Sequence, residues 1–84
     1  MISKLKYVII GDDDIFGKAI VASPKTGIEH SQMIPAGQTA YSAGFVTFGN
    51  DKAECWGESH SLGLKSRSID SKILTIQFYG NEPI

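Results

Sequence analysis

Two pairs of short apolar runs, each pair joined by turn-forming residues, limit what this chain can fold into. In the first pair, the runs at residues 4–10 and 15–23 are separated by "GDDD", which carries the residue types of a hairpin turn. In the second pair, "TAYSAGFVTF" at residues 39–48 is followed by "GNDK" and then by "AECWGES" at residues 53–59. We therefore expect two antiparallel β-hairpins, the first ending at Pro24, because proline donates no hydrogen bond to a β-ladder.

The segment between the hairpins, residues 25–37, predicts a short helix. Ile28, Gln32 and Met33 are spaced near one helical face, and Thr26 is available as an N-cap. Pro35 and Gly37 prevent the helix from continuing, so we expect at most two turns.

The C-terminal segment carries two periodicities. Ile69, Ile73 and Ile76 have the spacing of one helix face. Leu74, Ile76 and Phe78 occupy every second position, as the residues on one face of a strand do. The flanking residues favour helix: Ser66 or Ser68 can act as N-cap, Asp70 suits the first turn, and Gly80 suits the end. We expect a helix here.

The predicted fold class is α+β: two antiparallel hairpins form a small sheet, with a short middle helix and a C-terminal helix covering one face. Residues 1–84 are too few for two cores, so we expect a single domain. The edges of such a sheet are expected to be unprotected, and a small core needs further support. A homo-oligomer, either a dimer or a larger ring, is the expected consequence.

Composition excludes several classes of function. Eight basic residues stand against nine acidic ones, which leaves no field to attract duplex nucleic acid or a membrane surface. The start of the chain lacks the features of a signal peptide, and no apolar run is long enough to span a membrane. We therefore expect a cytoplasmic protein.

The single cysteine, Cys55, forms no disulfide within the chain, and with His30 and His60 it falls short of a zinc site. A buried, structural thiol is the favoured interpretation of Cys55. The sequence "GDDDI" at residues 11–15 lacks the ligand spacing of a calcium loop and is read as a solvated turn. We expect neither a metal ion nor a cofactor.

The polar run "GESHSLGLKSRS", residues 57–68, is the main candidate for a binding site. It ends at the N-terminus of the predicted helix, where unpaired backbone N–H groups attract anions. Lys65 and Arg67 add positive charge, and the run also contributes hydrogen-bonding side chains, those of Ser59, His60, Ser61 and Ser66. In the alternative interpretation the serines are ordinary helix caps, the cations are solvated, and Leu62 and Leu64 anchor the run to the core.

Catalysis by this run is not expected. Glu58, Ser59 and His60 are consecutive, and neighbours in an extended segment point to opposite faces, so they cannot form a hydrogen-bonded triad. Nearby aromatic rings can instead form a stacking platform. Trp56 and Tyr41 are the better candidates for it, because their polar tips allow partial exposure.

Two segments resemble a group of small bacteriophage and prophage proteins. "YSAGFVTF" at residues 41–48 and "GESHSLGLKSRSIDSKIL" at residues 57–74 are similar to that group's S-A-G-F-V strand and its G-x-S-x-S-L-x-L-x-S-R-x-x-D segment before a closing helix. The likeness covers the C-terminal half and, more loosely, the first strand pair. It departs at Ser68, where proline is more usual. The resemblance implies a phage-derived protein that acts in the bacterial cytoplasm.

Some small phage proteins sequester nucleotide second messengers of bacterial antiviral defence, and by analogy of role we expect the same here. The expected function is to bind an anionic, nucleotide-like small molecule without catalysis. Arg67, Lys65 and the amides near Ser66 would hold phosphate, Ser59, Ser61 and His60 would bind sugar or base, Trp56 or Tyr41 would stack, and Asp70 would hold Arg67 or cap the helix. The rival hypothesis is a protein-binding module that blocks or redirects a host protein through its sheet edge or an aromatic patch.

Overall fold

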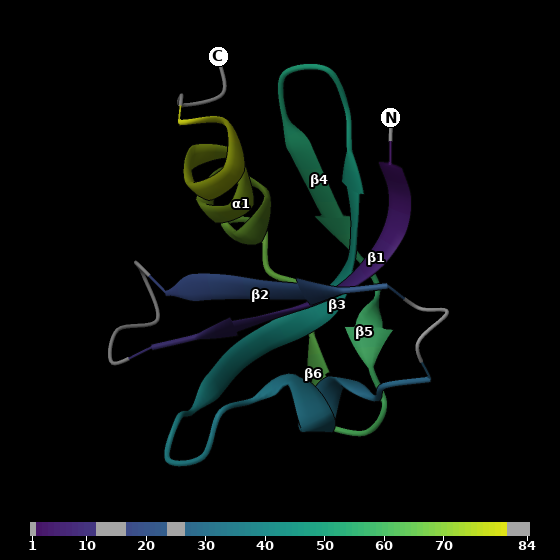
Figure 1. Cartoon of the computed structure of the whole chain (residues 1–84), viewed down its shortest axis with the longest axis vertical. Helices are drawn as coiled ribbons and strands as arrows, with labels where there is room; N and C mark the ends of the chain where they lie inside the picture. The colour runs from purple at the N-terminus through teal and green to yellow at the C-terminus, as the bar shows by residue number, and fades with distance from the viewer. Residues whose placement is uncertain (1, 12–16, 24–26, 81–84) are drawn as a thin grey trace.

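The computed structural model describes residues 2–11, 17–23 and 27–80, and it has the α+β architecture expected from the sequence. A four-stranded antiparallel sheet has the order β2-β1-β3-β4, and a two-stranded ladder, β5-β6, lies beside it (Figure 1). The strands are β1 (Ile2–Ile10), β2 (Lys18–Ala22), β3 (Ala40–Phe48), β4 (Ala53–Trp56), β5 (Glu58–Ser59) and β6 (Leu64–Lys65). The helices are the 3-10 helix η2 (His30–Met33) and the α-helix α1 (Asp70–Tyr79).

Both predicted hairpins are confirmed. β1 pairs with β2 from Lys6↔Ala22 to Ile10↔Lys18, and β3 pairs with β4 in the register that places Phe45 opposite Trp56. The hairpins join through β1 and β3, which also run antiparallel. The tip of the first turn, Pro24 and the proposed cap Thr26 lie outside the described residues.

The middle helix is shorter than expected. It is a single 3-10 turn rather than one or two α-helical turns, and it begins with a reciprocal capping box between Glu29 and Gln32. It stops at Ile34, which is extended with ψ 119°. The reason is Pro35, because a proline forces the preceding residue out of the helical region.

The second hairpin does not continue to residue 59 as expected. Gly57 has a φ of 80°, and this left-handed conformation ends β4 and turns the chain into the separate strand β5. The short ladder then pairs Glu58 with Lys65 and Ser59 with Leu64. β6 was not predicted, because a two-residue strand has no periodicity to detect.

The C-terminal helix is confirmed, and so is its end. Gly80 is left-handed with φ 76°, and its N–H donates to the carbonyl of Ile76 at 2.9 Å. The start differs from the prediction, because the N-cap is Ile69 and neither Ser66 nor Ser68 caps the helix. The carboxylate of Asp70, in the first turn, instead accepts the backbone N–H of Arg67 at 3.0 Å, which ties the preceding segment to the helix.

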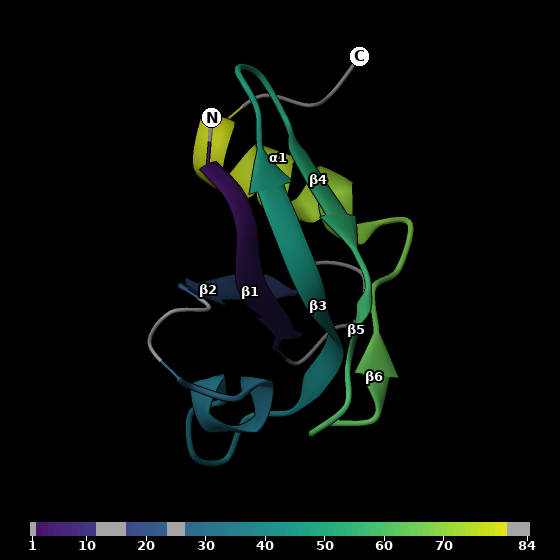
Figure 2. The ribbon, with the colours of Figure 1, turned by 90° about the vertical axis from the view of Figure 1, so that its right-hand side faces the viewer.

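The sheet is covered on both faces, not on one. α1 packs on the face that carries Tyr7, Ile9 and Val46, and Leu74 is buried against them. The opposite face is covered by η2 and by the segment around β5 and β6 (Figure 2). There Leu62 and Leu64 pack around a second buried cluster, Val8, Ile10, Met33 and Ala43. The two leucines therefore anchor the polar run to the core, as the alternative interpretation expected.

Side chains of α1 reach both edges of the sheet. At β2, the Gln77 amide accepts from the Ala19 N–H at 2.8 Å and donates to the Ala19 carbonyl at 2.9 Å. At β4, the N–H groups of Ala53 and Cys55 donate to the Thr75 and Ser71 hydroxyls, each at 2.9 Å. The expected oligomer assumed unprotected edges, and at these positions that assumption is wrong. Self-association itself stays a prediction.

Candidate functional site

The sheet separates the predicted site residues into two groups. Asp70, with Arg67, lies on the α1 face, where its carboxylate contacts Tyr7. His60 and Ser61 line a cleft together with Lys6. Tyr7 and Lys6 are neighbours in β1 and therefore point to opposite faces. The single concave spot expected to gather these groups is not formed within one chain.

On the α1 face, Asp70 is the centre of a buried polar network. Its side chain has no exposed surface, and it accepts the Tyr7 hydroxyl at 2.5 Å, the Arg67 Nε–H at 3.1 Å and the Arg67 backbone N–H at 3.0 Å. Burial, reinforced by the hydrogen bond to Asp70, raises the pKa of Tyr7 far above its ordinary value. Arg67 thus neutralises a buried carboxylate and fixes the start of α1. Asp70 therefore holds Arg67, as one of the two expected roles had it, and no side chain caps the start of α1.

The serines of the polar run support its own turns. The Ser59 side chain is buried, and its hydroxyl accepts the Leu62 N–H at 3.3 Å and lies 3.3 Å from the Ser61 hydroxyl. The Ser66 N–H donates to the Gly57 carbonyl at 3.0 Å, so this amide is already paired. Lys65 is exposed on β6, opposite Glu58.

An open cleft of about 230 Å³ lies on the sheet face opposite α1. Its lining comes from four separate parts of the chain and consists of Lys6, Glu29, His30, Phe45, Glu58, His60 and Ser61. The β1–β3 register places Lys6 opposite Phe45, and η2 brings His30 over the same region. Of the predicted site residues, the cleft contains His60 and Ser61.

Most polar side chains of the cleft already have partners. Lys6 Nζ donates to the Ile28 carbonyl at 2.5 Å, and Glu29 is held in the capping box. The buried His30 donates its Nε2–H to the Gly44 carbonyl at 2.7 Å, and the Ser61 hydroxyl accepts from the Ser31 N–H at 3.4 Å. Two exposed side chains of the cleft, those of Glu58 and His60, differ from the others in this respect. Among the described residues, the side chains of Glu58 and His60 have no hydrogen bond or ion pair.

Aromatic rings gather beside the cleft around Phe45. The Trp56 ring lies 5.2 Å from the Phe45 ring at 32°, and His30 meets Phe45 edge-on at 5.6 Å. The Lys4 ammonium lies 5.3 Å from the Phe45 ring centre. Trp56 remains 43% exposed, with its Nε1–H donating to the Thr47 hydroxyl at 3.4 Å. The structure therefore presents an accessible indole ring, supported from behind by a second aromatic ring.

Two backbone positions keep this aromatic cluster in place. At Gly57 an added Cβ would lie 2.9 Å from the Phe45 ring, so only glycine allows this close packing in its left-handed conformation. Lys4 is a non-glycine residue with a φ of 59°, at a register shift in β1. Such a conformation costs about 1–2 kcal/mol for an L-residue. The strained residue is therefore the one whose ammonium group contacts the Phe45 ring.

Tyr41, the other predicted stacking residue, lies on the same face of β3 as Phe45 by strand alternation. It is partly buried and does not line the cleft. The sequence reasoning missed Lys6, Glu29, His30, Phe45 and Glu58 as cleft residues. Only the β1–β3 pairing brings these groups together, and no local motif encodes it. The alternation of Lys4 and Lys6 within an apolar strand was the available signal.

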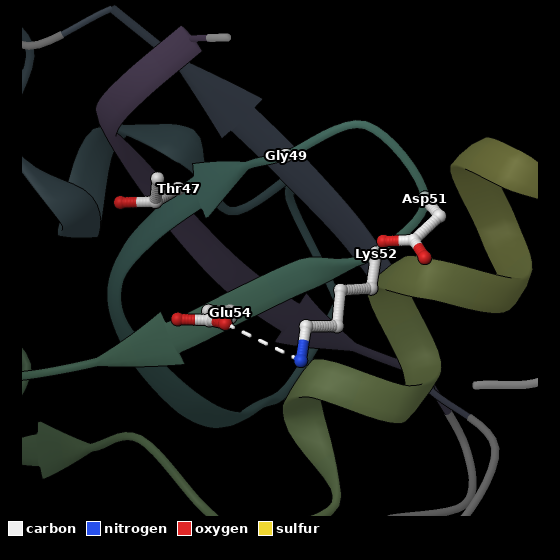
Figure 3. Close-up of a pocket in the computed structure, with 5 residues that line it drawn as sticks. All are labelled: Thr47, Gly49, Asp51, Lys52 and Glu54. Atoms are coloured by element: carbon white, nitrogen blue, oxygen red, sulfur yellow. Dashed lines mark ion pairs between the residues drawn. The ribbon is translucent and has the colours of Figure 1, made fainter. Parts of the chain in front are cut away.

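A second hollow lies on the hairpin that joins β3 and β4 (Figure 3). Its volume is about 220 Å³, and Thr47, Gly49, Asp51, Lys52 and Glu54 line it. Lys52 and Glu54 form an ion pair at 3.6 Å, but both side chains are more than half exposed. Exposed pairs of this kind contribute little free energy. We assign no chemistry to this hollow.

Within residues 2–11, 17–23 and 27–80, no three His, Cys, Asp or Glu side chains are grouped as a metal would require. Cys55 is partly buried, and burial raises the pKa of its thiol to about 12. A thiol with so high a pKa is a poor nucleophile. In the part of the chain that the structure describes, no helix has the length and apolar character to cross a membrane.

No family model, no curated protein and no solved structure matches the chain. The resemblance to phage proteins, with the role that it implies, stays a prediction.

Proposed function

We propose that this protein binds an anionic, nucleotide-like small molecule in the cleft beside Phe45 and holds it without transforming it. The observation that carries the proposal is the half-exposed Trp56 ring, packed on Phe45 next to a polar cleft. An exposed, rigidly supported indole is a favourable surface for a nucleobase, because stacking on an aromatic side chain contributes about 1–3 kcal/mol per base.

Lysine side chains near the aromatic cluster can contact the phosphate of a nucleotide whose base stacks on Trp56. Lys4 stands over the Phe45 ring, and Lys6 lines the cleft. The Lys6 ammonium has three N–H donors, and its bond to the Ile28 carbonyl leaves two of them for a phosphate oxygen. Lys65 adds an exposed cation opposite Glu58. These lysines replace Arg67 as the proposed phosphate contacts.

The remaining cleft groups suit sugar and base. His60 and Ser61 can exchange hydrogen bonds with hydroxyl groups, and Glu58 can accept from them. The Ser59 hydroxyl accepts the Leu62 N–H and so stabilises its own turn. This favours a structural role for Ser59 over a role as nucleophile, and a site that binds a ligand without transforming it. In the setting that the phage resemblance implies, such a protein would sequester a signalling nucleotide of an antiviral defence system.

A fluorescence titration tests the proposal directly, because Trp56 is the only tryptophan in the chain. Nucleoside monophosphates and cyclic dinucleotides should quench its emission with saturation, and calorimetry should give matching affinities. Trp56→Leu should weaken binding about tenfold, which corresponds to the loss of one stacking contact. Phe78→Leu is the matched control, since Phe78 is 46% exposed on α1, away from the cleft, and its replacement should leave affinity unchanged.

The rival hypothesis, a protein-binding module, predicts a different outcome. Side chains of α1 already occupy backbone groups of Ala19 at one sheet edge and of Ala53 and Cys55 at the other, so we expect a protein partner to use the aromatic surface around Trp56. Failure of every nucleotide to quench Trp56 or to raise the melting temperature would refute nucleotide binding and leave the rival in place.

A further inference from the structure

We infer that the proposed cleft selects guanine among the purine bases, and that the carboxylate of Glu58 binds the Watson–Crick edge of guanine. This inference rests on the proposed function and adds the identity of the base. It depends on which polar groups of the cleft are still available to a ligand.

The available groups are few. Lys6, Glu29, His30 and Ser61 each use at least one polar atom to hold the walls of the cleft together. Glu58 is exposed, lines the cleft and has no side-chain partner among the described residues. A ligand in the cleft therefore meets a free carboxylate, which offers two acceptor oxygens and no donor when ionised.

The position of Glu58 suits contact with a base stacked on Trp56. The two residues are separated only by Gly57, whose left-handed conformation turns the chain at that point, and Glu58 follows in β5. Glu58 lines the cleft together with Phe45, on which the Trp56 ring packs, so a base that stacks on the indole with its edge over the cleft would meet the Glu58 carboxylate. Lys65 stands opposite Glu58 in the β5–β6 register, yet the two side chains form no ion pair in the structure. The ammonium group of Lys65 therefore remains available for a phosphate.

The chemistry of the bases decides between them. Guanine presents two adjacent donors on its Watson–Crick edge, the N1–H and the N2 amino group, which match the two oxygens of one carboxylate. Hypoxanthine keeps the N1–H and lacks the amino group. Adenine has an acceptor at N1, which the carboxylate repels. Because hydrogen bonds to a charged group are the stronger kind, the expected order of affinity is guanine, then hypoxanthine, then adenine.

The test is calorimetry of the full chain with GMP, IMP and AMP, which carry the same sugar and phosphate. GMP should bind about tenfold or more tightly than AMP, with IMP between them. Glu58→Gln should lower the affinity for GMP about tenfold and leave the affinity for AMP unchanged or higher. Asp51→Asn removes the same charge from the hairpin that joins β3 and β4, outside the cleft, and should preserve the GMP preference.

Three outcomes separate this inference from the proposed function. Equal affinity for GMP and AMP, with both lost in Trp56→Leu, refutes guanine selection and retains nucleotide binding. A GMP preference that survives Glu58→Gln assigns the selection to another group and overturns the role of Glu58. Absence of binding to all three nucleotides and to cyclic dinucleotides removes both proposals. Glu58 is exposed, so the melting temperature of Glu58→Gln without nucleotide should stay close to that of the wild type.

Discussion

Replacement of Asp70 by alanine should remove most of the stability of this fold. The change deletes the acceptor of three hydrogen bonds, from the Tyr7 hydroxyl and from two N–H groups of Arg67. It also leaves a guanidinium with only 27% of its side-chain surface exposed next to a buried hydroxyl. Breaking a buried charge pair by removing one partner costs about 3–5 kcal/mol. A small domain has a total unfolding free energy at the lower end of about 5–15 kcal/mol.

Tyr7→Phe provides a milder version of the same test. It removes one hydroxyl and retains the ion pair between Asp70 and Arg67, so the expected loss is about 1–3 kcal/mol. Arg67→Ala should also destabilise the protein, because it leaves the buried carboxylate without its cation. The original sequence-based hypothesis, in which Arg67 serves a ligand, predicts almost no change in the melting temperature for that variant.

Urea denaturation followed by circular dichroism measures these losses. With an m-value of about 1 kcal/mol per molar urea for a small domain, Tyr7→Phe should move the midpoint down by about 1–3 M. Asp51→Ala removes an exposed carboxylate from the β3–β4 hairpin and should stay within about 0.5 kcal/mol of the wild type. If Asp70→Ala and Tyr7→Phe both behave like this control, the network is not what fixes the start of α1.

Three further variants test other parts of the structure. Gly57→Ala should cost about 1–2 kcal/mol and displace the Phe45 ring, which a thermal melt and a nucleotide titration would detect; unchanged values would contradict the close packing. Gln77→Ala should cost about 1–2 kcal/mol, because the Ala19 backbone loses its partner at the β2 edge, and amide exchange at Ala19 should accelerate. The folded state raises the pKa of Cys55 from 9.0 to about 12, so the stability that the protonated thiol contributes is complete below the unfolded pKa and is lost as pH rises through this window. Urea denaturation should therefore be compared at one pH below and one pH above 9.0. The urea midpoint should fall less between these two pH values in Cys55→Val than in the wild type. An equal fall in both proteins would contradict the raised pKa.

Local sequence signals were sufficient for the elements that end at well-defined residues. "GNDK" between two apolar runs identified the β3–β4 hairpin, and Gly80 identified the end of α1. They were insufficient where a distant contact decides the conformation. Ser66 and Ser68 are good N-caps in isolation, but neither caps α1, and the start of the helix is instead fixed by the buried carboxylate of Asp70, which binds Tyr7 and Arg67.

The candidate site was harder to predict than the fold. The polar run after Trp56 stands out in the sequence, but its two ends lie on opposite faces of the sheet. Lys6, His30 and Phe45 meet there only through the β1–β3 pairing and the placement of η2. A sequence pattern reports spacing along the chain, so it could not show that β1 and β3 are neighbours.

Nitrogen-edited NMR of the labelled protein during titration with GMP is the most direct test of the central claim that the cleft beside Trp56 binds a nucleotide. We expect shifts of the Trp56 indole N–H and of the amides of Lys6, Phe45, Glu58 and His60, with little change at Arg67 and Asp70. Shifts concentrated at Arg67 and Asp70, or a spectrum that does not change at all, would contradict it.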